Sequence, residues 1–423
     1  MSRLALWLGG LIVLLVVPLI VPPGWVVVLS KMLIAALFAL AFNLLSGQAG
    51  MLSFGHAAYF AVGVFATLHL MQAAEAGLNV PTPLMPLAGM AAGLICGVIC
   101  GVFATLRSGV YFSMITLAIA ELFYNLAPNL EGLFGGEGGI SSLRQPFAGL
   151  TFGSDREVYY LVAAWAVAGM ALMYFYTRTP FGRLTIALRE NEQRVRFLGY
   201  NTYHSRIIIF TISAMFSGLA GGLLAVTNES GNYVLFETNT SATVVLHAFI
   251  GGAGVFLGPA IGAILLTGFA HLVSDATPLV LLYQGAIFML VMVFAPKGLA
   301  GAAMSLREPL RSGRWRSLIL PAFAVASATL AIAASFVLAM ELLERFFSTQ
   351  YAARVQSGHG LIPIQYLGYD WGVRSPLTWA VPIGLALVGI LLMRFGVGMS
   401  RRALRMAASQ PAVKFGFVLG AKR

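Results

Sequence analysis

The sequence predicts an all-α fold, a polytopic bundle of about ten to twelve membrane-spanning helices that includes one segment broken by glycine or re-entrant. Composition is the first reason: 59% of the 423 residues are hydrophobic and only 10% are charged, whereas soluble domains carry about 25% charged residues. The second reason is that apolar runs of about 20 residues, long enough to cross a bilayer as helices, recur along the whole chain.

The apolar runs give the approximate position of each span. We expect spans near residues 4–21, 26–46, 50–72, 85–106, 109–127, 158–177, 206–228, 278–296, 318–343 and 376–396, with a broken region at 241–274. The first run follows Arg3, is long and lacks a clear small-residue cleavage site. A retained span is therefore favoured over a cleaved signal peptide.

Basic residues set the predicted orientation, because Lys and Arg are enriched in cytoplasmic loops. Most of the 26 basic residues lie in clusters at 178–206, 297–316 and 394–423. The loop 73–84 has no Lys or Arg, and 128–157 has more acidic than basic residues, so both should face outward. Both termini are therefore expected in the cytoplasm. The net charge of +11 belongs to these loops and does not indicate nucleic-acid binding.

Glycine and proline interrupt the apolar region 241–274, at Gly251, Gly252, Gly254, Gly258 and Pro259. Both residue types weaken helices. An even number of crossings must separate the flanking basic clusters, so the region should form either a re-entrant hairpin or two short crossings. Non-helical backbone inside a bilayer is tolerated only within protein or along a wet cavity. This makes Gly251, Gly252 and Gly254 candidates for the substrate path.

Small residues recur at helical spacing in two other runs. Glycine occupies every fourth position at 89–101, and Gly218 and Gly222 repeat the spacing. Such glycines let helix backbones approach closely, and we expect helix packing within the subunit rather than a dimer face. Cys96 and Cys100 lie one helical turn apart in an apolar run. We expect two small buried residues there, neither a disulfide nor a zinc site.

The sequence lacks the motifs of several enzyme classes. A phosphate-binding P-loop requires Gly-Lys-Ser or Gly-Lys-Thr, and none of the four lysines lies in that context. H-E-x-x-H and G-x-S-x-G are also missing. Glu121 is the clearest acid inside a predicted span, and ion-coupled carriers usually need more such groups. We therefore expect a transport protein with no catalytic residue, metal site or cofactor of its own.

The segment 43–63, NLLSGQAGMLSFGHAAYFAVG, places polar residues within a glycine-interrupted apolar run. Polar groups at this depth need partners. Gln48, Ser53 and His56 are therefore candidates for a substrate path. The alternative is that they hydrogen-bond to neighbouring helices, which is the more common role of such residues.

The basic segment 178–206 begins RTPFGRLTIALRENE, in which Pro180 can start a helix and Gly199 can stop it. Leu184, Ala187 and Leu188 share one face. We expect a short amphipathic helix, or a pair, that docks on a soluble partner. The alternative is a solvated loop that only sets topology. The docking candidates are Arg183, Arg189, Glu190, Glu192 and Gly199.

Five segments in order along residues 30–301 resemble permease subunits of ATP-binding-cassette importers of the branched-chain amino acid type. Residues 43–63 are similar to the family pattern N-L-L-x-G-x-x-G-x-x-S-x-G-H. The others are FGGEGGI at 134–140, RTPFGRLTIALRENE at 178–192, GGAGVFLGPAIGA at 251–263 and PKGLAG at 296–301. One such motif would be weak, but five in order are specific.

The resemblance implies one subunit of an ATP-driven importer of branched-chain or similar hydrophobic amino acids in a bacterial inner membrane. The implied partners are a sister permease subunit, two cytoplasmic ATP-binding subunits that hydrolyse the ATP, and a periplasmic substrate-binding protein. Alternating access of the bundle is the implied mechanism. The same fold with urea, a short amide or a small carboxylate as cargo is an alternative. A self-sufficient channel or secondary carrier is another.

Two features depart from the family pattern. The usual Ala-Ala-Glu-Ala-Leu-Gly of the coupling helix is replaced by residues 194–199, in which Arg194 and Arg196 favour an acidic surface on the ATP-binding partner. Residues 302–423 extend beyond the point where such permeases end. We therefore expect a permease core at 1–301, with its coupling loop near 178–206, and an extension at 302–423 with two spans and a basic cytoplasmic tail.

Overall fold

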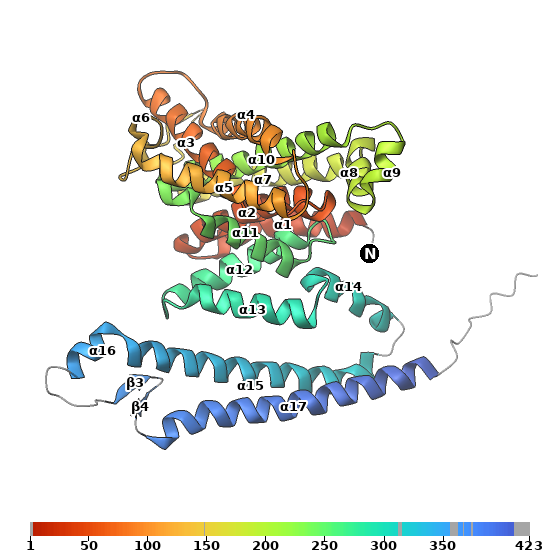
Figure 1. Cartoon of the computed structure of the whole chain (residues 1–423). Coiled ribbons are helices and arrows are strands. Elements are labelled where there is room, and N and C mark those ends of the chain that lie inside the picture. The colour runs from red at the N-terminus through yellow and green to blue at the C-terminus, as the bar shows by residue number, and fades with distance from the viewer. Residues whose placement is uncertain are drawn as a thin grey trace, which may run out of the picture. The chain divides into compact units, whose positions relative to one another are not determined.

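The protein is almost entirely helical in the computed structural model, which describes residues 3–147, 149–311, 315–355, 363–366, 368–373 and 375–409 (Figure 1). Nine helices within these ranges are long and apolar enough to cross a membrane. The prediction of a polytopic helical bundle is confirmed. The end of the predicted basic tail, 410–423, lies outside the described residues.

The chain forms two compact units, Met1–Ala303 and Met304–Arg423. The first unit contains α1 (Arg3–Ile20), α2 (Pro23–Asn43), η1 (Leu44–Gln48), α3 (His56–Glu75), η2 (Thr82–Leu84), α4 (Pro86–Ala104), α5 (Val110–Leu126), η3 (Ala127–Asn129), α6 (Glu131–Phe134), α7 (Asp155–Arg178), α8 (Pro180–Glu190), α9 (Glu192–Phe197), α10 (Thr202–Asn228), η4 (Tyr233–Phe236), α11 (Thr238–Gly251), α12 (Gly258–Ser274) and α13 (Val280–Phe294). Helix α14 (Gly298–Arg311) contains the boundary between the units. Strand β1 (Ile140–Ser141) pairs antiparallel with β2 (Ser230–Gly231).

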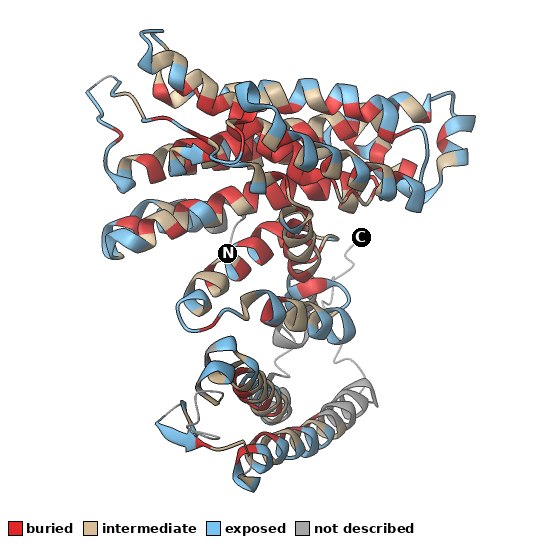
Figure 2. Ribbon diagram, turned by 60° about the vertical axis from the view of Figure 1, so that its left-hand side comes forward, coloured by how far each residue is buried: buried red, intermediate tan, exposed pale blue. Residues whose placement is uncertain are grey.

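Helices α2, α3 and α10 are the most buried spans of the first unit. Figure 2 shows the buried residues, in red, gathered in the interior of that unit. Glycine allows α4 to pack closely against α10. A Cβ atom at Gly93 would lie 2.9 Å from the Gly218 Cα, which is closer than carbon atoms can approach. The prediction that these glycines pack helices within the subunit is confirmed. Cys96 and Cys100 on α4 are free thiols whose sulfur atoms are 3.8 Å apart.

The span predicted near 50–72 begins later in the structure, at His56. Residues 49–55 leave the helical conformation because Gly50 adopts a left-handed φ of +70°, which glycine accepts without strain. The π-helical turn η1 precedes this stretch. The chain from 44 to 55, here called the interrupted segment, therefore separates two long helices.

The broken region at 241–274 consists of two helices, α11 and α12, joined by residues 252–257. Near the end of α12, the His271 ring lies 5.0 Å from the ring of Trp25, at the start of α2. At the other end of α2, a Cβ atom at Gly47 would lie 2.7 Å from the Ala253 carbonyl oxygen. Helix α12 therefore runs antiparallel to α2, and the 252–257 turn lies beside the interrupted segment.

The second unit is a helical hairpin. Its long helices are α15 (Trp315–Phe347) and α17 (Pro376–Ser409), and its connection contains α16 (Thr349–Arg354), β3 (Ile364–Tyr366) and β4 (Tyr369–Trp371). Gly389 of α17 packs against α15, where a Cβ atom would lie 3.1 Å from the Ala328 carbonyl oxygen. The Ser335 hydroxyl also donates to the Pro382 carbonyl at 2.6 Å. Each long helix contains a stretch apolar enough to span a membrane.

The close approach of α4 and α10 gives a stability prediction. Gly93→Val should force the helices apart and lower stability by about 1–3 kcal/mol, the usual cost of overpacking. Thermal unfolding of the purified protein, followed by size-exclusion chromatography, measures this. The matched control is Gly285→Val on α13, because no heavy atom of the described residues lies within 4 Å of a Cβ there. Equal melting temperatures for the two variants would contradict the prediction.

Candidate functional site

The interrupted segment (residues 44–55) is held by a backbone hydrogen bond of its own and by two side chains of α5. The Met51 backbone N–H donates to the Leu45 carbonyl at 3.0 Å. From α5, the Ser113 hydroxyl donates to the Leu52 carbonyl at 2.6 Å. The Phe54 N–H donates to the Thr116 hydroxyl at 3.1 Å. These side chains satisfy backbone groups that a regular helix would pair internally.

The start of α3 receives the same kind of support from α11. The Ala57 N–H donates to the Ser241 hydroxyl at 2.9 Å. The Ser53 hydroxyl accepts from the Gly55 N–H at 3.3 Å, and Ser53 is fully buried. Two of the first N–H groups at this helix end therefore bond to side chains rather than to water, as a buried helix terminus requires.

His56 is a buried histidine within a polar chain of contacts. Its Nε2 lies 2.8 Å from the Ser213 hydroxyl of α10, which in turn donates to the Ala41 carbonyl at 2.6 Å. The Ser213 proton is thus used, so His56 Nε2 is the donor. His56 Nδ1 has no hydrogen-bond partner among the described residues, and the same holds for the side-chain oxygen of Gln48. Ser53 and His56 thus bond to neighbouring segments, while Gln48 Oε1 and His56 Nδ1 keep unused acceptors.

The basic segment 178–206 forms two helices, α8 and α9. Thr179 caps α8 by accepting from the Gly182 N–H at 3.1 Å, and Pro180 follows at the first helical position. Asn191 separates the two helices and caps α9 by accepting from the Arg194 N–H at 2.9 Å. Gly199 has a left-handed φ of +87° just after α9. Residues 178–199 are here called the coupling region.

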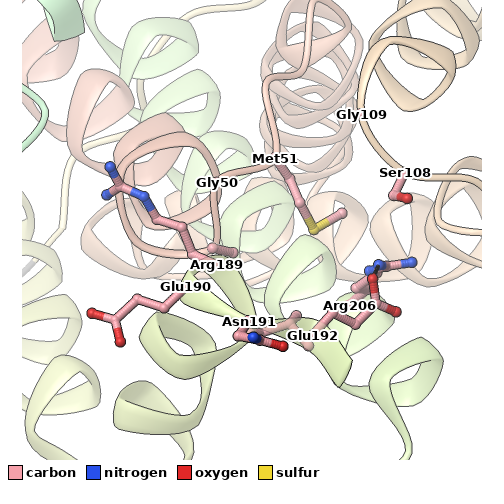
Figure 3. Close-up of a pocket in the computed structure, with 11 residues that line it drawn as sticks. Gly50, Met51, Ser108, Gly109, Arg189, Glu190, Asn191, Glu192 and Arg206 are labelled. Atoms are coloured by element: carbon pink, nitrogen blue, oxygen red, sulfur yellow. Dashed lines mark hydrogen bonds and ion pairs between the residues drawn. The ribbon is translucent and has the colours of Figure 1, made fainter. Parts of the chain in front are cut away.

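Arg189 joins the coupling region to the interrupted segment. Its guanidinium donates to the Gly47 carbonyl, and its side chain packs on Gly50, where a Cβ atom would lie 2.8 Å from the Arg189 Cγ. Figure 3 shows Arg189 beside Gly50 and Met51 in a pocket of about 260 Å³. Ser108 and Gly109, which precede α5, line the opposite wall.

Glu192 joins the coupling region to α10. Its carboxylate accepts from the Arg206 guanidinium, from the Thr202 hydroxyl at 3.0 Å and from Arg196 at 3.3 Å. Because the Arg206 side chain is only 12% exposed, this pair is better shielded from water than a surface ion pair. Of the docking candidates, Arg189 and Glu192 bond to other segments of the chain, although Arg189 is itself exposed, as are Arg183, Glu190 and Gly199.

The three glycine candidates in the broken region have different environments. Gly251 packs against α12, and a Cβ atom there would lie 3.0 Å from the Gly262 nitrogen. Gly252, at φ +107°, approaches the Lys297 carbonyl, at 2.6 Å from the position of a Cβ. Gly254 is exposed, and in the part of the chain that the structure describes no heavy atom lies within 4 Å of a Cβ there. The GGAG and PKG motifs therefore meet at Gly252, next to the interrupted segment.

Several residues of this site could not be predicted from the sequence. Thr116 and Ser213 are small polar residues within long apolar helices, and Ser241 is one of several polar residues at the start of α11, so nothing in their spacing marks them. Arg206 appeared only as one member of a basic cluster. The described residues contain no group of three or more His, Cys, Asp or Glu side chains that could hold a metal ion. The contacts join the coupling region, the interrupted segment and the 252–257 turn to one another.

Comparison with known proteins gives one family. The model of that family, described as "Branched-chain amino acid transport system / permease component", matches residues 25–296. The chain is 31% identical over 319 residues to the high-affinity branched-chain amino acid transport system permease protein LivM of Escherichia coli, covering 70% of this chain and 74% of the relative. It is 30% identical to LivM of Salmonella typhimurium with the same coverage.

A shorter similarity links the chain to a different transport system. Over 103 residues, 23% of this chain and 29% of the relative, it is 30% identical to the autoinducer 2 import system permease protein LsrC of Yersinia pestis. No solved structure matches the chain.

Proposed function

This chain belongs to the permease-component family of branched-chain amino acid transport systems, and we propose that it forms one membrane-spanning subunit of an ATP-driven amino acid importer. The proposed cargo is a branched-chain or similar hydrophobic amino acid, moved across the inner membrane by alternating access. ATP hydrolysis is assigned to partner subunits, since the sequence has no P-loop. Both termini, with the coupling region, are proposed to lie in the cytoplasm.

One contact carries this proposal: the Arg189 guanidinium of α8 bonded to the Gly47 carbonyl. A coupling helix must transmit the movement of a soluble ATPase to the helices that line the path. Arg189 lies on a helix outside the predicted spans, and its side chain reaches the interrupted segment between α2 and α3. The same point contacts the 252–257 turn through Gly47 and Ala253. A displacement of α8 would therefore act on α2, α3 and the 252–257 turn at once, and we assign all three to the substrate path.

Helix α10 offers a second connection, from the coupling region to the opposite end of the bundle. Its 27 residues span about 40 Å. At its start Arg206 pairs with Glu192, and just after its end Glu229 pairs with Arg144 at 2.8 Å. Glu229 has a left-handed φ of +56°, which is uncommon for a residue other than glycine. We assign α10 the role of linking the two ends during alternating access.

The surface of the coupling region suits a protein partner. Phe197 is 89% exposed and Leu198 is 69% exposed at the end of α9. Exposed aromatic and aliphatic residues of this kind serve as anchors in protein interfaces. We assign this tip to an ATP-binding subunit. A sister permease and a periplasmic substrate-binding protein complete the proposed assembly.

The function is tested by purifying the tagged chain from its native membrane and identifying the associated proteins by mass spectrometry. A second permease and P-loop ATPases should be recovered. The complex, reconstituted with its binding protein, should accumulate leucine only when ATP is supplied. A single-component oligomer that transports without ATP would overturn the proposal.

Within the same assay, Arg189→Ala should uncouple the machine. Loss of a hydrogen bond to a charged group, worth about 1.5–3 kcal/mol, should reduce uptake about tenfold or more while ATP hydrolysis continues. Arg107→Ala is the matched control, because Arg107 is exposed on the loop between α4 and α5. Normal uptake by Arg189→Ala, or an equal loss in both variants, would refute the assigned role of this contact.

The two arginines of α9 give a separate prediction about the partner. Arg194 and Arg196 are both exposed, and Arg196 makes only a 3.3 Å pair with Glu192 that water screens. The double variant Arg194→Glu, Arg196→Glu should therefore insert and fold normally but recover less ATPase subunit on purification. Recovery should also fall with salt in the wild type. Unchanged recovery and uptake in the variant would exclude an acidic docking surface.

A further inference from the structure

The turn η1 (residues 44–48) differs from the helices on either side of it. Its backbone has the π-helical pattern, in which an N–H bonds to the carbonyl five residues earlier. This pattern is rare and occurs mostly as single turns, frequently at functional positions. A further bond, from the Met51 N–H to the Leu45 carbonyl, spans six residues. The backbone is thus wound more loosely here than in α2 and α3.

Two amide side chains at this turn have buried oxygen atoms without a donor. Asn43 is the buried last residue of α2, and Gln48 is the last residue of η1. Neither Asn43 Oδ1 nor Gln48 Oε1 accepts a hydrogen bond within the described part of the chain. A buried acceptor left unpaired destabilises the state that contains it. The two amides therefore favour a second arrangement of the turn in which they find donors.

The two ends of the interrupted segment differ in how tightly they are held. Residues 52–55 are tied to α5 by two hydrogen bonds, and a Cβ atom at Gly55 would overlap the Thr116 carbonyl. Residues 49–51 instead line the pocket of about 260 Å³. Figure 3 shows Met51 in this pocket, opposite the loop that precedes α5. The backbone after η1 therefore has space on one side into which it can shift.

The same turn is bound by the coupling region. Arg189 donates to the Gly47 carbonyl, and a Cβ atom at Gly47 would overlap the Asn43 amide. Conversion of a π-helical turn to α-helix removes one residue from the turn and rotates the residues that follow by about 100° around the helix axis. The Gly47 carbonyl would then change its direction relative to Arg189. Movement of the coupling region and the winding of η1 are thus linked through one hydrogen bond.

We propose that residues 44–48 form a winding switch, which is π-helical in the state described here and α-helical in the ATP-bound state, where Asn43 and Gln48 gain hydrogen-bond donors. The residue released from the turn moves toward the pocket beside Met51. Two unpaired amides are kept at the turn because they stabilise the second state more than the first. This inference rests on the proposed importer function and adds to it the element that changes conformation.

Hydrogen–deuterium exchange of the purified complex tests the switch without any variant. Peptides that cover residues 44–51 should exchange about tenfold or more slowly after ATP and vanadate are added, because a regular helical turn opens less often than a loosely wound one. Residues 33–40, in the regular part of α2, are the internal control and should exchange equally in both states. Equal exchange of residues 44–51 with and without trapped ATP would overturn the proposal.

Asn43→Leu replaces the amide with an apolar group of similar size. The nucleotide-free complex should then melt about 2 °C or more above the wild type, because an unpaired acceptor is removed. ATP-driven leucine uptake should fall about fivefold or more, because the second state loses a hydrogen bond. Gln48→Met should act in the same direction. Asn228→Leu, at the exposed last residue of α10, controls for the helix preference of leucine and should leave the melting temperature unchanged.

Two outcomes with these variants count against the switch. A lower melting temperature for both Asn43→Leu and Gln48→Met would show that the amides are already bonded in the nucleotide-free state. Uptake at the wild-type rate by both variants would show that the second state does not use them. If the wild-type complex accumulates no leucine with ATP, the importer function itself fails, which is a separate result because neither exchange nor melting depends on transport.

Discussion

The backbone polar groups of residues 49–55 need partners, and the rest of the first unit is arranged around that need. Lipid offers no hydrogen bonds, so a chain that leaves the helical conformation inside a bundle must be satisfied by protein. Ser113 and Thr116 of α5 supply bonds to Leu52 and Phe54. On either side of this stretch, Ser241 of α11 accepts from the Ala57 N–H and Arg189 of the coupling region donates to the Gly47 carbonyl. The interrupted segment and its two ends are thereby tied to α5, α11, the coupling region and the 252–257 turn.

Close packing makes these ties mechanically effective. The helices of the first unit approach through glycine, as at Gly93 and Gly218, or at the junction of Gly252 with the Lys297 carbonyl. At such contacts the two backbones touch directly, with no flexible side chain between them. A movement of one helix therefore moves its neighbour. Allostery needs a bistable element that both sites bias, and we propose the interrupted segment for that role.

Sequence reasoning gave the helical bundle, the packing role of the glycines and the short helices near 178–206, because each has a periodic or compositional signal. It misplaced the start of α3, since the apolar run continues through a stretch that Gly50 takes out of the helix. It could not pair Arg189 with Gly47 or His56 with Ser213, because those contacts join residues more than a hundred positions apart. Spacing along a chain carries no information about such pairs without the fold.

The central claim is that Arg189 transmits movement of the coupling region to the inner turns of the bundle. Spin labels at Gly254→Cys and Leu143→Cys, both exposed positions, measure it directly in the assembled complex after Cys96 and Cys100 are replaced by serine. Pulsed electron paramagnetic resonance should show the distance between the labels shift when ATP is trapped. In the Arg189→Ala background the shift should disappear although ATP is still bound. An unchanged distance in the parent protein, or the same shift in the variant, would contradict the account.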